Sequence, residues 1–243
     1  DVLLSYTPTE SGLQNCDISI TDFPVTFDDR FFFSYRLQQE LKILCLSDTG
    51  SSKYINSLFE KDEYFLVFAT ANGVVKRTAL KDYRNVHRTG IIAINLRDGD
   101  SLIGVTWTSG DDHLLLGTAS GLAIRFHEDD ARAMGRSASG VKGIELKPDN
   151  YVVGLIKIGS NEKDLDLLTV TENGYGKRTS IDDYPVRGRG GQGVISIVVN
   201  ERNGKVISSS HCYNGDEIML ITSNGTLVRT RVDELRVMGR NTQ

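Results

Sequence analysis

Lysine and arginine residues follow each of four Thr-x-[Asn/Ser]-Gly motifs within a few positions. The glycines of these motifs are Gly73, Gly121, Gly174 and Gly225, spaced by 48, 53 and 51 residues. The cations that come directly after the motifs are Lys76, Arg77, Arg125, Lys177, Arg178, Arg229 and Arg231. The loops beyond them add Lys81, Arg84, Arg88, Arg132, Arg136, Lys142, Arg187, Arg189, Arg236 and Arg240. The regular spacing predicts that these cations occupy equivalent positions in repeated structural units.

Two interpretations of these cations remain open. If the units are related by rotation about an axis, the cations form one curved stripe, and such a stripe suits the phosphate backbone of a nucleic acid. Alternatively, they solvate strand ends and guard sheet edges. Acidic residues in the same loops offset part of the positive field; they are Asp82, Asp182, Asp183, Asp233 and Glu234. His87 and His127 are not equivalently placed, and we interpret them as ordinary surface residues.

The segments around the four glycines are typical of β-hairpins. An apolar, β-prone run precedes each motif and a short run follows it, and Asn-Gly supplies the positive-φ pair of a type I′ turn. A short polar stretch then fits one turn of helix or a loop. A second glycine opens a third strand, expected at 90–95, 143–146 and 193–198. A fourth strand is expected at 102–107, 152–156 and 206–209.

Units of about 50 residues with four short strands are typical of propeller blades, which bury their faces by stacking around an axis. The expected fold is therefore all-β, a propeller-like disc of four-stranded blades, with a β-sandwich as the less favoured alternative. The expected blades span 62–110, 111–161, 162–214 and 215–243. Residues 1–61 do not keep the rhythm and are expected to be a degenerate or incomplete N-terminal blade region. Within it, 30–36 is an isolated strand candidate and Gly50 a further turn candidate.

A glycine-rich loop at 186–193 contains the spacing Gly188-x-Gly190-x-x-Gly193. A dinucleotide-binding loop of this form needs a strand before it and a helix after it. Here a strand candidate follows, so we interpret the loop as a cationic connection. Its glycines would allow backbone amides to approach phosphates beside Arg187 and Arg189. A flexible turn between strands is the alternative.

Composition excludes several other classes of protein. The chain has 243 residues, 39% hydrophobic and 25% charged, which is typical of a globular domain. No apolar run approaches the roughly 18 residues of a membrane-spanning helix. Cys16, Cys45 and Cys212 are far apart and form neither a disulfide framework nor a zinc site, so a reducing, cytosolic setting is the default. We find no metal-ligand cluster and no pairing of nucleophile with base, hence no catalytic residue.

Long strings in the repeats carry a resemblance to a known family. They include ATANGVVKRTALKDYRNV, GIIAINLRDGDSLIGV, RAMGRSASGVKGI, TENGYGKRTSIDDYP and GTLVRTRVDELRVMGRNTQ. These strings resemble the C-terminal domain of the bacterial DNA gyrase A polypeptide, part of a type IIA topoisomerase, almost continuously from Lys61 to Gln243. The resemblance implies a β-pinwheel, a disc in which neighbouring blades exchange strands.

The resemblance also implies a function. The positive rim of the disc would bind, bend and wrap duplex DNA, through the seventeen cations named above, to support ATP-dependent negative supercoiling. Catalysis would belong to other domains, so this chain would hold no cofactor, while the complete enzyme would use ATP and Mg²⁺. The implied partners are duplex DNA, the rest of the gyrase A subunit and the gyrase B subunit, without a membrane. The implied location is the bacterial cytoplasm, on the nucleoid.

The chain departs from the family pattern at one motif. The hallmark heptapeptide of the family, Gln-Arg-Arg-Gly-Gly-Lys-Gly in the first blade, is not found, and its nearest echo is Arg189-Gly-Gly-Gln-Gly193. The corresponding domain of the A-type subunit of topoisomerase IV, which often lacks a full hallmark, is therefore an alternative. A protein-interaction propeller is a second alternative, for which the aromatic stretch 31–35 is the only hint. A propeller enzyme has no support.

Overall fold

The computed structural model describes residues 12–19, 30–37, 64–84 and 90–242, with only the backbone given for the first two segments. The chain forms two compact units, 1–50 and 51–243. In the first unit, β1 (Gly12–Ser19) pairs antiparallel with β2 (Arg30–Leu37). The strand expected at 30–36 is therefore present, as half of a hairpin. The turn candidate at Gly50 lies outside the described residues.

The second unit contains the four predicted β-hairpins. They are β3 (Phe65–Thr70) with β4 (Val74–Ala79), β6 (His113–Thr118) with β7 (Leu122–His127), β10 (Asp166–Thr171) with β11 (Gly176–Ser180), and β14 (Glu217–Ile221) with β15 (Leu227–Arg231). We number the repeats first to fourth in this order. A position written +4 lies four residues after the turn glycine of its repeat.

The hairpin turns differ from the predicted type I′ turn. Only the glycine of each motif has a positive φ, between 77° and 81°, whereas a type I′ turn needs positive φ at two residues. The amide of Gly73 donates to the carbonyl of Thr70, and the Thr70 hydroxyl accepts from the amide of Val74. The threonine of the motif therefore closes a longer loop that ends on a left-handed glycine. This explains why threonine and glycine recur together.

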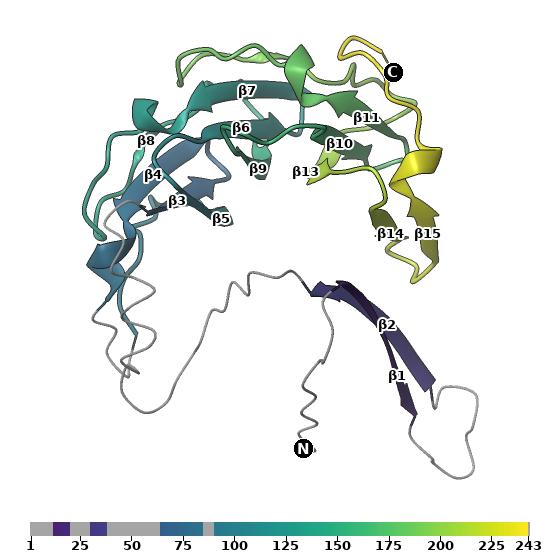
Figure 1. Ribbon diagram of the computed structural model, residues 1–243. Coiled ribbons are helices and arrows are strands. Elements are labelled where there is room, and N and C mark those ends of the chain that lie inside the picture. Colours follow the sequence, from purple (N-terminus) through teal and green to yellow (C-terminus); the bar gives the residue numbers. More distant parts are fainter. Residues whose placement is uncertain (1–11, 20–29, 38–63, 85–89, 243) are drawn as a thin grey trace. The chain divides into compact units, whose positions relative to one another are not determined.

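Neighbouring repeats exchange strands (Figure 1). The first sheet has the order β5-β3-β4-β8 and the second β12-β7-β6-β9. The inner strands β5 (Leu102–Thr108) and β9 (Val152–Ile158) belong to the repeat of their own hairpin. The outer strands β8 (Val141–Lys142) and β12 (Val194–Ile195) follow the next hairpin in sequence and return to the one before it. The third sheet is β11-β10-β13, with β13 at Val206–Cys212, and the fourth is β14-β15.

The third strand differs from the predictions: 143–146 contains no strand, since β8 lies just before it, and β12 covers only part of 193–198. Only two residues of β8 and of β12 form ladder pairs, and 90–95 contains no strand. The chain leaves the ladder because its next amides bond to a hairpin turn: those of Gly143 and Ile144 donate to the carbonyl of Gly73. Ser196 and Ile197 do the same at Gly121. The apolar runs therefore cap the neighbouring hairpin instead of extending its sheet.

The polar stretch after each hairpin forms one turn of 3₁₀ helix. These turns are η1 (Leu80–Tyr83), η2 (Glu128–Asp130), η3 (Ile181–Asp183) and η4 (Val232–Glu234). The part of the chain that the structure describes contains no α-helix, which confirms the all-β prediction. None of its helices is long and apolar enough to span a bilayer.

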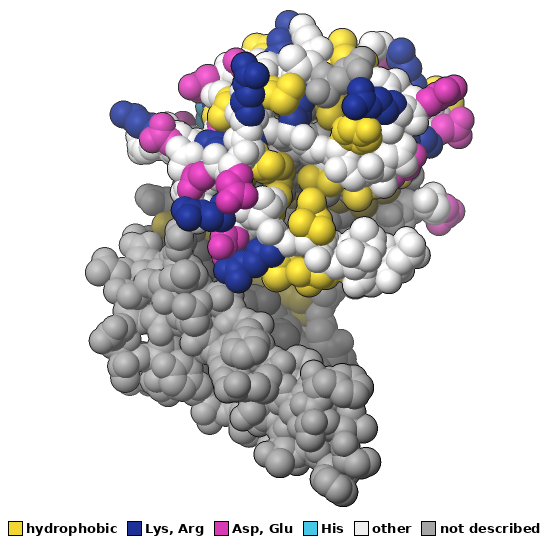
Figure 2. All heavy atoms as spheres, turned by 90° about the vertical axis from the view of Figure 1, so that its right-hand side faces the viewer, with side chains coloured by type: hydrophobic (Ala, Val, Ile, Leu, Met, Phe, Trp, Pro, Cys, Tyr) yellow, Lys and Arg dark blue, Asp and Glu magenta, His cyan; other side chains and the backbone are white. Residues whose placement is uncertain are grey.

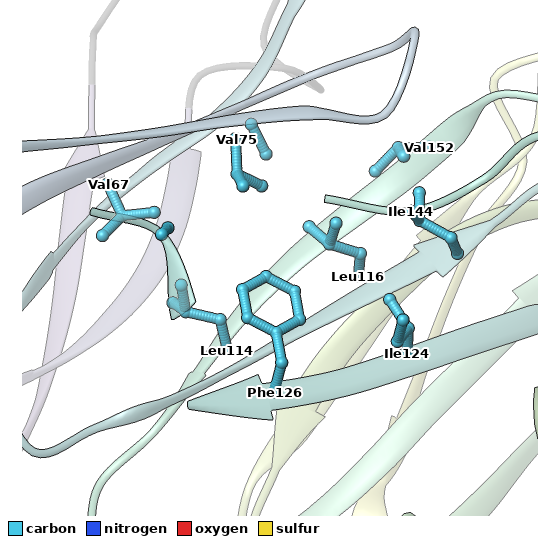
Figure 3. Packing of buried hydrophobic residues seen from close by; sticks show 10 residues of the cluster. Val67, Val75, Leu114, Leu116, Ile124, Phe126, Ile144 and Val152 are labelled. Atoms are coloured by element: carbon cyan, nitrogen blue, oxygen red, sulfur yellow. The ribbon is translucent and has the colours of Figure 1, made fainter. Parts of the chain in front are cut away.

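The hydrophobic core lies between successive sheets (Figure 3). Val67 and Val75 of the first sheet pack against Leu116 and Phe126 of the second, all at most 5% exposed. A second cluster joins the second and third sheets around Leu115, Ile156 and Tyr184. Each fully buried side chain of this size contributes about 1.5–3 kcal/mol. The sheets are therefore held face to face, and their edges remain for other contacts.

Candidate nucleic-acid interface

Two of the predicted DNA-binding lysines, both at position +3, are buried. Lys76 is 0% and Lys177 2% exposed. The ammonium group of Lys76 donates to the carbonyls of Ala93 and Arg136. That of Lys177 donates to the carbonyls of Gly239, Arg240 and Thr242, at 2.9, 2.6 and 3.0 Å. Because these donors are used internally, the prediction that both lysines contact phosphates is replaced by a structural role.

Burial also weakens the charge of these two lysines. Desolvation, reinforced by the positive charge of Arg136, lowers the pKa of Lys76 from 10.5 to about 8. Desolvation and Arg240 lower the pKa of Lys177 to about 8 in the same way. In both pairs the lysine belongs to one repeat and the arginine to the next. The lysine therefore holds the backbone of the neighbouring repeat at the residue that carries the arginine.

The arginines at position +4 join each repeat to the 3₁₀ helix of the next. Arg77 pairs with Glu128 at 3.0 Å and with Asp129, both in η2. The guanidinium of Arg125 donates to the carbonyl of Ile181 in η3 at 3.2 Å, and Arg178 donates to that of Val232 in η4 at 3.1 Å. Each backbone adds a bond, since the carbonyls of the three arginines accept from the amides of Met134, Arg187 and Met238.

These +4 arginines are consequently not free surface cations. Arg77 is 5% and Arg178 6% exposed, and Arg125 is half-buried. Arg77 stacks on the ring of Phe65 with its guanidinium carbon 3.7 Å from the ring centre, and Arg178 forms a buried ion pair with Asp166. The surface charge is therefore lower than the spacing of the cations predicts, because cations that are buried with partners recur as regularly as exposed ones.

In the fourth repeat the cations are exposed but paired. Arg229 forms an ion pair with Glu217, and Arg231 with Asp233 at 3.2 Å. Glu217 lies across the hairpin from Arg231 as Asp166 lies across from Ser180, so Glu217 and Asp166 are equivalent. The carboxylate at this hairpin position therefore pairs with the +4 arginine of its own repeat in both the third and fourth repeats.

The arginines at position +15 form a regular set on the segments that follow the 3₁₀ helices and run to the outer strands. We call these the returning segments; their described residues are 90–95, 131–142, 184–195 and 235–242. The arginines are Arg136, Arg189 and Arg240, while Arg88 of the first repeat lies outside the described residues. Each is half-buried and donates through Nη1 to a carbonyl of the segment that precedes it in this series. The acceptors are Ile92 at 3.3 Å, Lys142 at 2.7 Å and Ile195 at 3.1 Å. These acceptors are equivalent, since each lies two residues after Gly90, Gly140 or Gly193.

The remaining predicted cations are exposed: Lys81, Arg84, Arg132, Lys142, Arg187 and Arg236. Arg84, Arg132 and Arg236 all occupy position +11. Among the described residues, the side chains of Arg132, Arg187 and Arg236 form no ion pair or hydrogen bond. Lys142 lies 3.9 Å from Glu145. The structure thus reduces the candidate surface to these residues and the half-buried arginines at +15.

Carboxylates accompany these cations, as predicted. Asp129 and Asp130 of η2, Asp182 and Asp183 of η3, and Asp233 and Glu234 of η4 are all exposed. Figure 2 shows Lys and Arg side chains interspersed with Asp and Glu on the face that it presents. An anionic ligand would therefore meet fewer carboxylates along the arginines of the returning segments than at η2, η3 and η4.

The glycine-rich loop is a packed connection. Gly193, with φ of 80°, precedes the two-residue strand β12, so the helix required for dinucleotide binding is absent here. The amide of Gly190 donates to the carbonyl of Gly143 at 2.6 Å, and Arg189 donates through Nε to that of Asp130 at 2.6 Å. Residues 189–190 therefore fix the loop to the preceding repeats, and Arg187 remains exposed.

No cluster of three or more His, Cys, Asp or Glu side chains suited to a metal occurs among the described residues. His127, interpreted as a surface residue, is partly exposed and lies 3.4 Å from Asp111.

Sequence comparison identifies similar proteins. The family model described as "DNA gyrase C-terminal domain, beta-propeller" matches residues 64–106, 112–158, 165–210 and 216–243. The DNA gyrase A subunit of Salmonella typhimurium strain LT2 is 55% identical over 185 residues, which cover 76% of this chain and 21% of that protein. The corresponding gyrase protein of Escherichia coli K12 is 49% identical over the same shares. The chain thus spans about a fifth of the length of these curated relatives.

Solved structures are similar in fold. The C-terminal domain of a DNA topoisomerase IV aligns with a TM-score of 0.71 and 28% identity, covering 76% of this chain and 57% of that one. A DNA gyrase A C-terminal domain aligns with a TM-score of 0.66 and 27% identity, covering 75% and 60%. The two structural similarities are close to each other, so they do not separate the two enzymes, whereas the sequence relatives described above are gyrase subunits.

Proposed function

This chain belongs to the family of DNA gyrase C-terminal domains, and we propose that it binds and bends duplex DNA along the returning segments of its repeats. The intact protein would be the DNA gyrase A subunit, working with the gyrase B subunit in the bacterial cytoplasm. The domain would wrap DNA to support ATP-dependent negative supercoiling. It would contribute no catalytic residue, and ATP and Mg²⁺ would act in other parts of the enzyme.

One observation carries the proposal. The returning segments repeat an arrangement in which an arginine at +15 is fixed by a carbonyl of the previous segment and exposed cations lie nearby. Arg136, Arg189 and Arg240 are the fixed members, and Arg132, Arg187 and Arg236 are exposed beside them in sequence. A guanidinium that donates one such bond, or two in the case of Arg189, keeps other N–H groups for a phosphate. Because this arrangement recurs at successive contacts between repeats, it forms a track that suits a continuous polyanion.

The proposal favours gyrase over topoisomerase IV. The curated relatives described above are gyrase proteins of the A type at 49–55% identity, and the two solved structures, at 28% and 27% identity, favour neither enzyme. Phosphate contacts carry no base information, so binding should tolerate changes of DNA sequence.

The test is a titration of this chain with duplexes of several lengths at several salt concentrations. With about six phosphates neutralised, the logarithm of the association constant should fall against that of salt with a slope of roughly −5. Arg187→Ala or Arg236→Ala should reduce the slope by about 1 each and weaken binding evenly across sequences.

Lys205→Ala is a matched control, because Lys205 is also exposed but lies outside the returning segments. Binding that ignores salt, or that the control weakens as much as Arg187→Ala does, would refute the proposed track. In the complete gyrase, the paired change Arg187→Ala/Arg236→Ala should reduce supercoiling and spare relaxation without ATP.

A further inference from the structure

Large aliphatic side chains are exposed on the same returning segments as the arginines. Val186 is 50%, Ile195 44% and Val237 49% exposed. Val186 and Val237 are equivalent, because they form isolated parallel bridges with Arg125 and Arg178 at the outer edges of β7 and β11. Ile195 pairs with Leu122 on the same outer edge of β7 as Val186. Single exposed aliphatic residues are ordinary, but these recur at equivalent places.

The exposed position of the short outer strand is aliphatic in one repeat and cationic in another. In β12, Val194 packs against the core and Ile195 points outward; in β8, Val141 packs inward and Lys142 is exposed. Ile92, Lys142 and Ile195 are equivalent, and each supplies the carbonyl that holds an arginine at +15. Ile92 is 64% exposed. An occupant of this edge must therefore present apolar and anionic surface side by side.

We infer that Val186 and Ile195 are apolar contacts for the minor groove of bound DNA, where the groove turns toward the protein. This rests on the proposed DNA binding. The deoxyribose faces that line the groove are apolar and lie between two rows of phosphates, which matches aliphatic residues flanked by cations such as Arg187 and Arg189. Architectural proteins bend DNA by setting apolar side chains into this groove while cations hold the flanking phosphates. The aliphatic pair thus governs bending, and the arginines govern affinity.

The experiment compares Val186→Ser/Ile195→Ser with the unchanged chain on a long duplex. Hydroxyl radicals attack deoxyribose from the minor groove, so wild-type binding should protect sugars at intervals of about 10 base pairs, as in other wrapped DNA. A fluorophore pair at the duplex ends reports bending. The variant should lose the periodic protection and much of the energy transfer, while the salt slope stays unchanged. Val186→Ile/Ile195→Val keeps both positions aliphatic and should therefore give both signals as the unchanged chain does.

Ile207→Ser is the control, because Ile207 is 55% exposed on β13, at the opposite edge of its sheet from β11. It should behave as wild type, and thermal unfolding should show all variants folded. Unchanged protection and energy transfer in the double serine variant, with normal salt-dependent binding, would overturn this inference alone. Absence of salt-dependent binding in the unchanged chain would overturn the proposed function as well. A fall in the salt slope of the serine variant would overturn the division between bending and affinity.

Discussion

Lys177 donates a hydrogen bond of 2.6 Å to the carbonyl of Arg240, which lies 63 residues further along the chain. Both residues were predicted to contact DNA, but Lys177 is buried, whereas Arg240 is half-buried beside the surface that we propose as the DNA track. Lys76 and Arg136 repeat this relationship between the first and second repeats. The buried lysines therefore position the backbone from which the +15 arginines extend.

Lys177→Met should loosen the segment that follows η4. The carbonyls of Gly239, Arg240 and Thr242 lose their common donor in a part-buried place, where an acceptor left without a partner costs at most about 1–3 kcal/mol. Limited trypsin digestion should then cut at Arg236 and Arg240 faster than in the unchanged chain. Lys205→Met, at an exposed lysine, should not alter these rates. Equal cutting in both variants would contradict the role of Lys177.

The lowered pKa values of Lys76 and Lys177, about 8, predict a pH dependence of stability. The folded lysines lose protons near pH 8, whereas unfolded lysines keep them to about pH 10.5. Between these values the unfolded state binds more protons, so this contribution to the free energy of unfolding rises with pH. Burial raises the pKa of the Cys212 thiol from 9.0 to about 11, which opposes the trend once unfolded thiols ionise.

Urea unfolding between pH 7.5 and 9 tests this sign. The free energy of unfolding of the unchanged chain, minus that of Lys76→Met/Lys177→Met, should increase with pH across this range. The double variant shares Cys212, so the subtraction removes the opposing thiol contribution. A difference that is flat or falls with pH would show that the ammonium groups are not desolvated as described.

The repeated hairpins could be predicted from sequence because their information is local. Thr70, Gly73 and the residues between them close one turn through their own hydrogen bonds, so the motif marks each hairpin wherever it occurs. The all-β fold and the number of hairpins in 64–242 followed directly. The length of β8 and β12 could not be read in this way, since it depends on a carbonyl of another repeat, at Gly73 or Gly121.

The candidate site was harder to predict because a charged residue type does not reveal its partner. Arg77 and Arg178 contact residues 51 to 54 positions away, and nothing near them in sequence distinguishes them from the exposed Arg132. For Arg178 the available signal is the acid Asp166, which lies across the hairpin from the +6 residue of the third repeat, whereas Phe65 takes this place in the first repeat and gives no such signal for Arg77. Exposed Val186 and Ile195 carry no charge and were not considered.

Glu128 should be the carboxylate whose removal most destabilises the contact between the first and second repeats. It is 0% exposed and accepts from Thr108, from the amides of Gly110 and Asp112, and pairs with Arg77. Glu128→Ala leaves a buried arginine with less compensation, and the free energy of unfolding should fall by about 3–5 kcal/mol. Urea unfolding measures this loss.

A double replacement at the same contact should recover much of the free energy of unfolding that Glu128→Ala loses. The position of Glu128 is taken by Ile181 and Val232 in the third and fourth repeats. Arg77→Leu/Glu128→Val should therefore be more stable than Glu128→Ala, because removing both charges leaves none unpaired. If the double variant were the less stable of the two, Arg77 would stabilise the fold chiefly through Phe65 and Asp129 and not through Glu128.

Replacement by alanine should destabilise the protein at one glycine of the 186–193 loop and have little effect at another. Gly193 has φ of 80°, and a Cβ there would lie 2.4 Å from the carbonyl oxygen of Ala123, whereas a Cβ at Gly188 meets nothing within 4 Å. Gly193→Ala should lower the free energy of unfolding by more than the roughly 1–2 kcal/mol of the left-handed backbone alone, and Gly188→Ala by at most about 0.5 kcal/mol. Urea unfolding measures both, and DNA titration of the stable Gly188→Ala variant separates packing from phosphate approach. Undiminished DNA affinity of Gly188→Ala would show that the loop needs a glycine for packing at position 193 and not for contact with DNA at position 188. Weakened affinity with unchanged stability would show that Gly188 lies at the DNA surface.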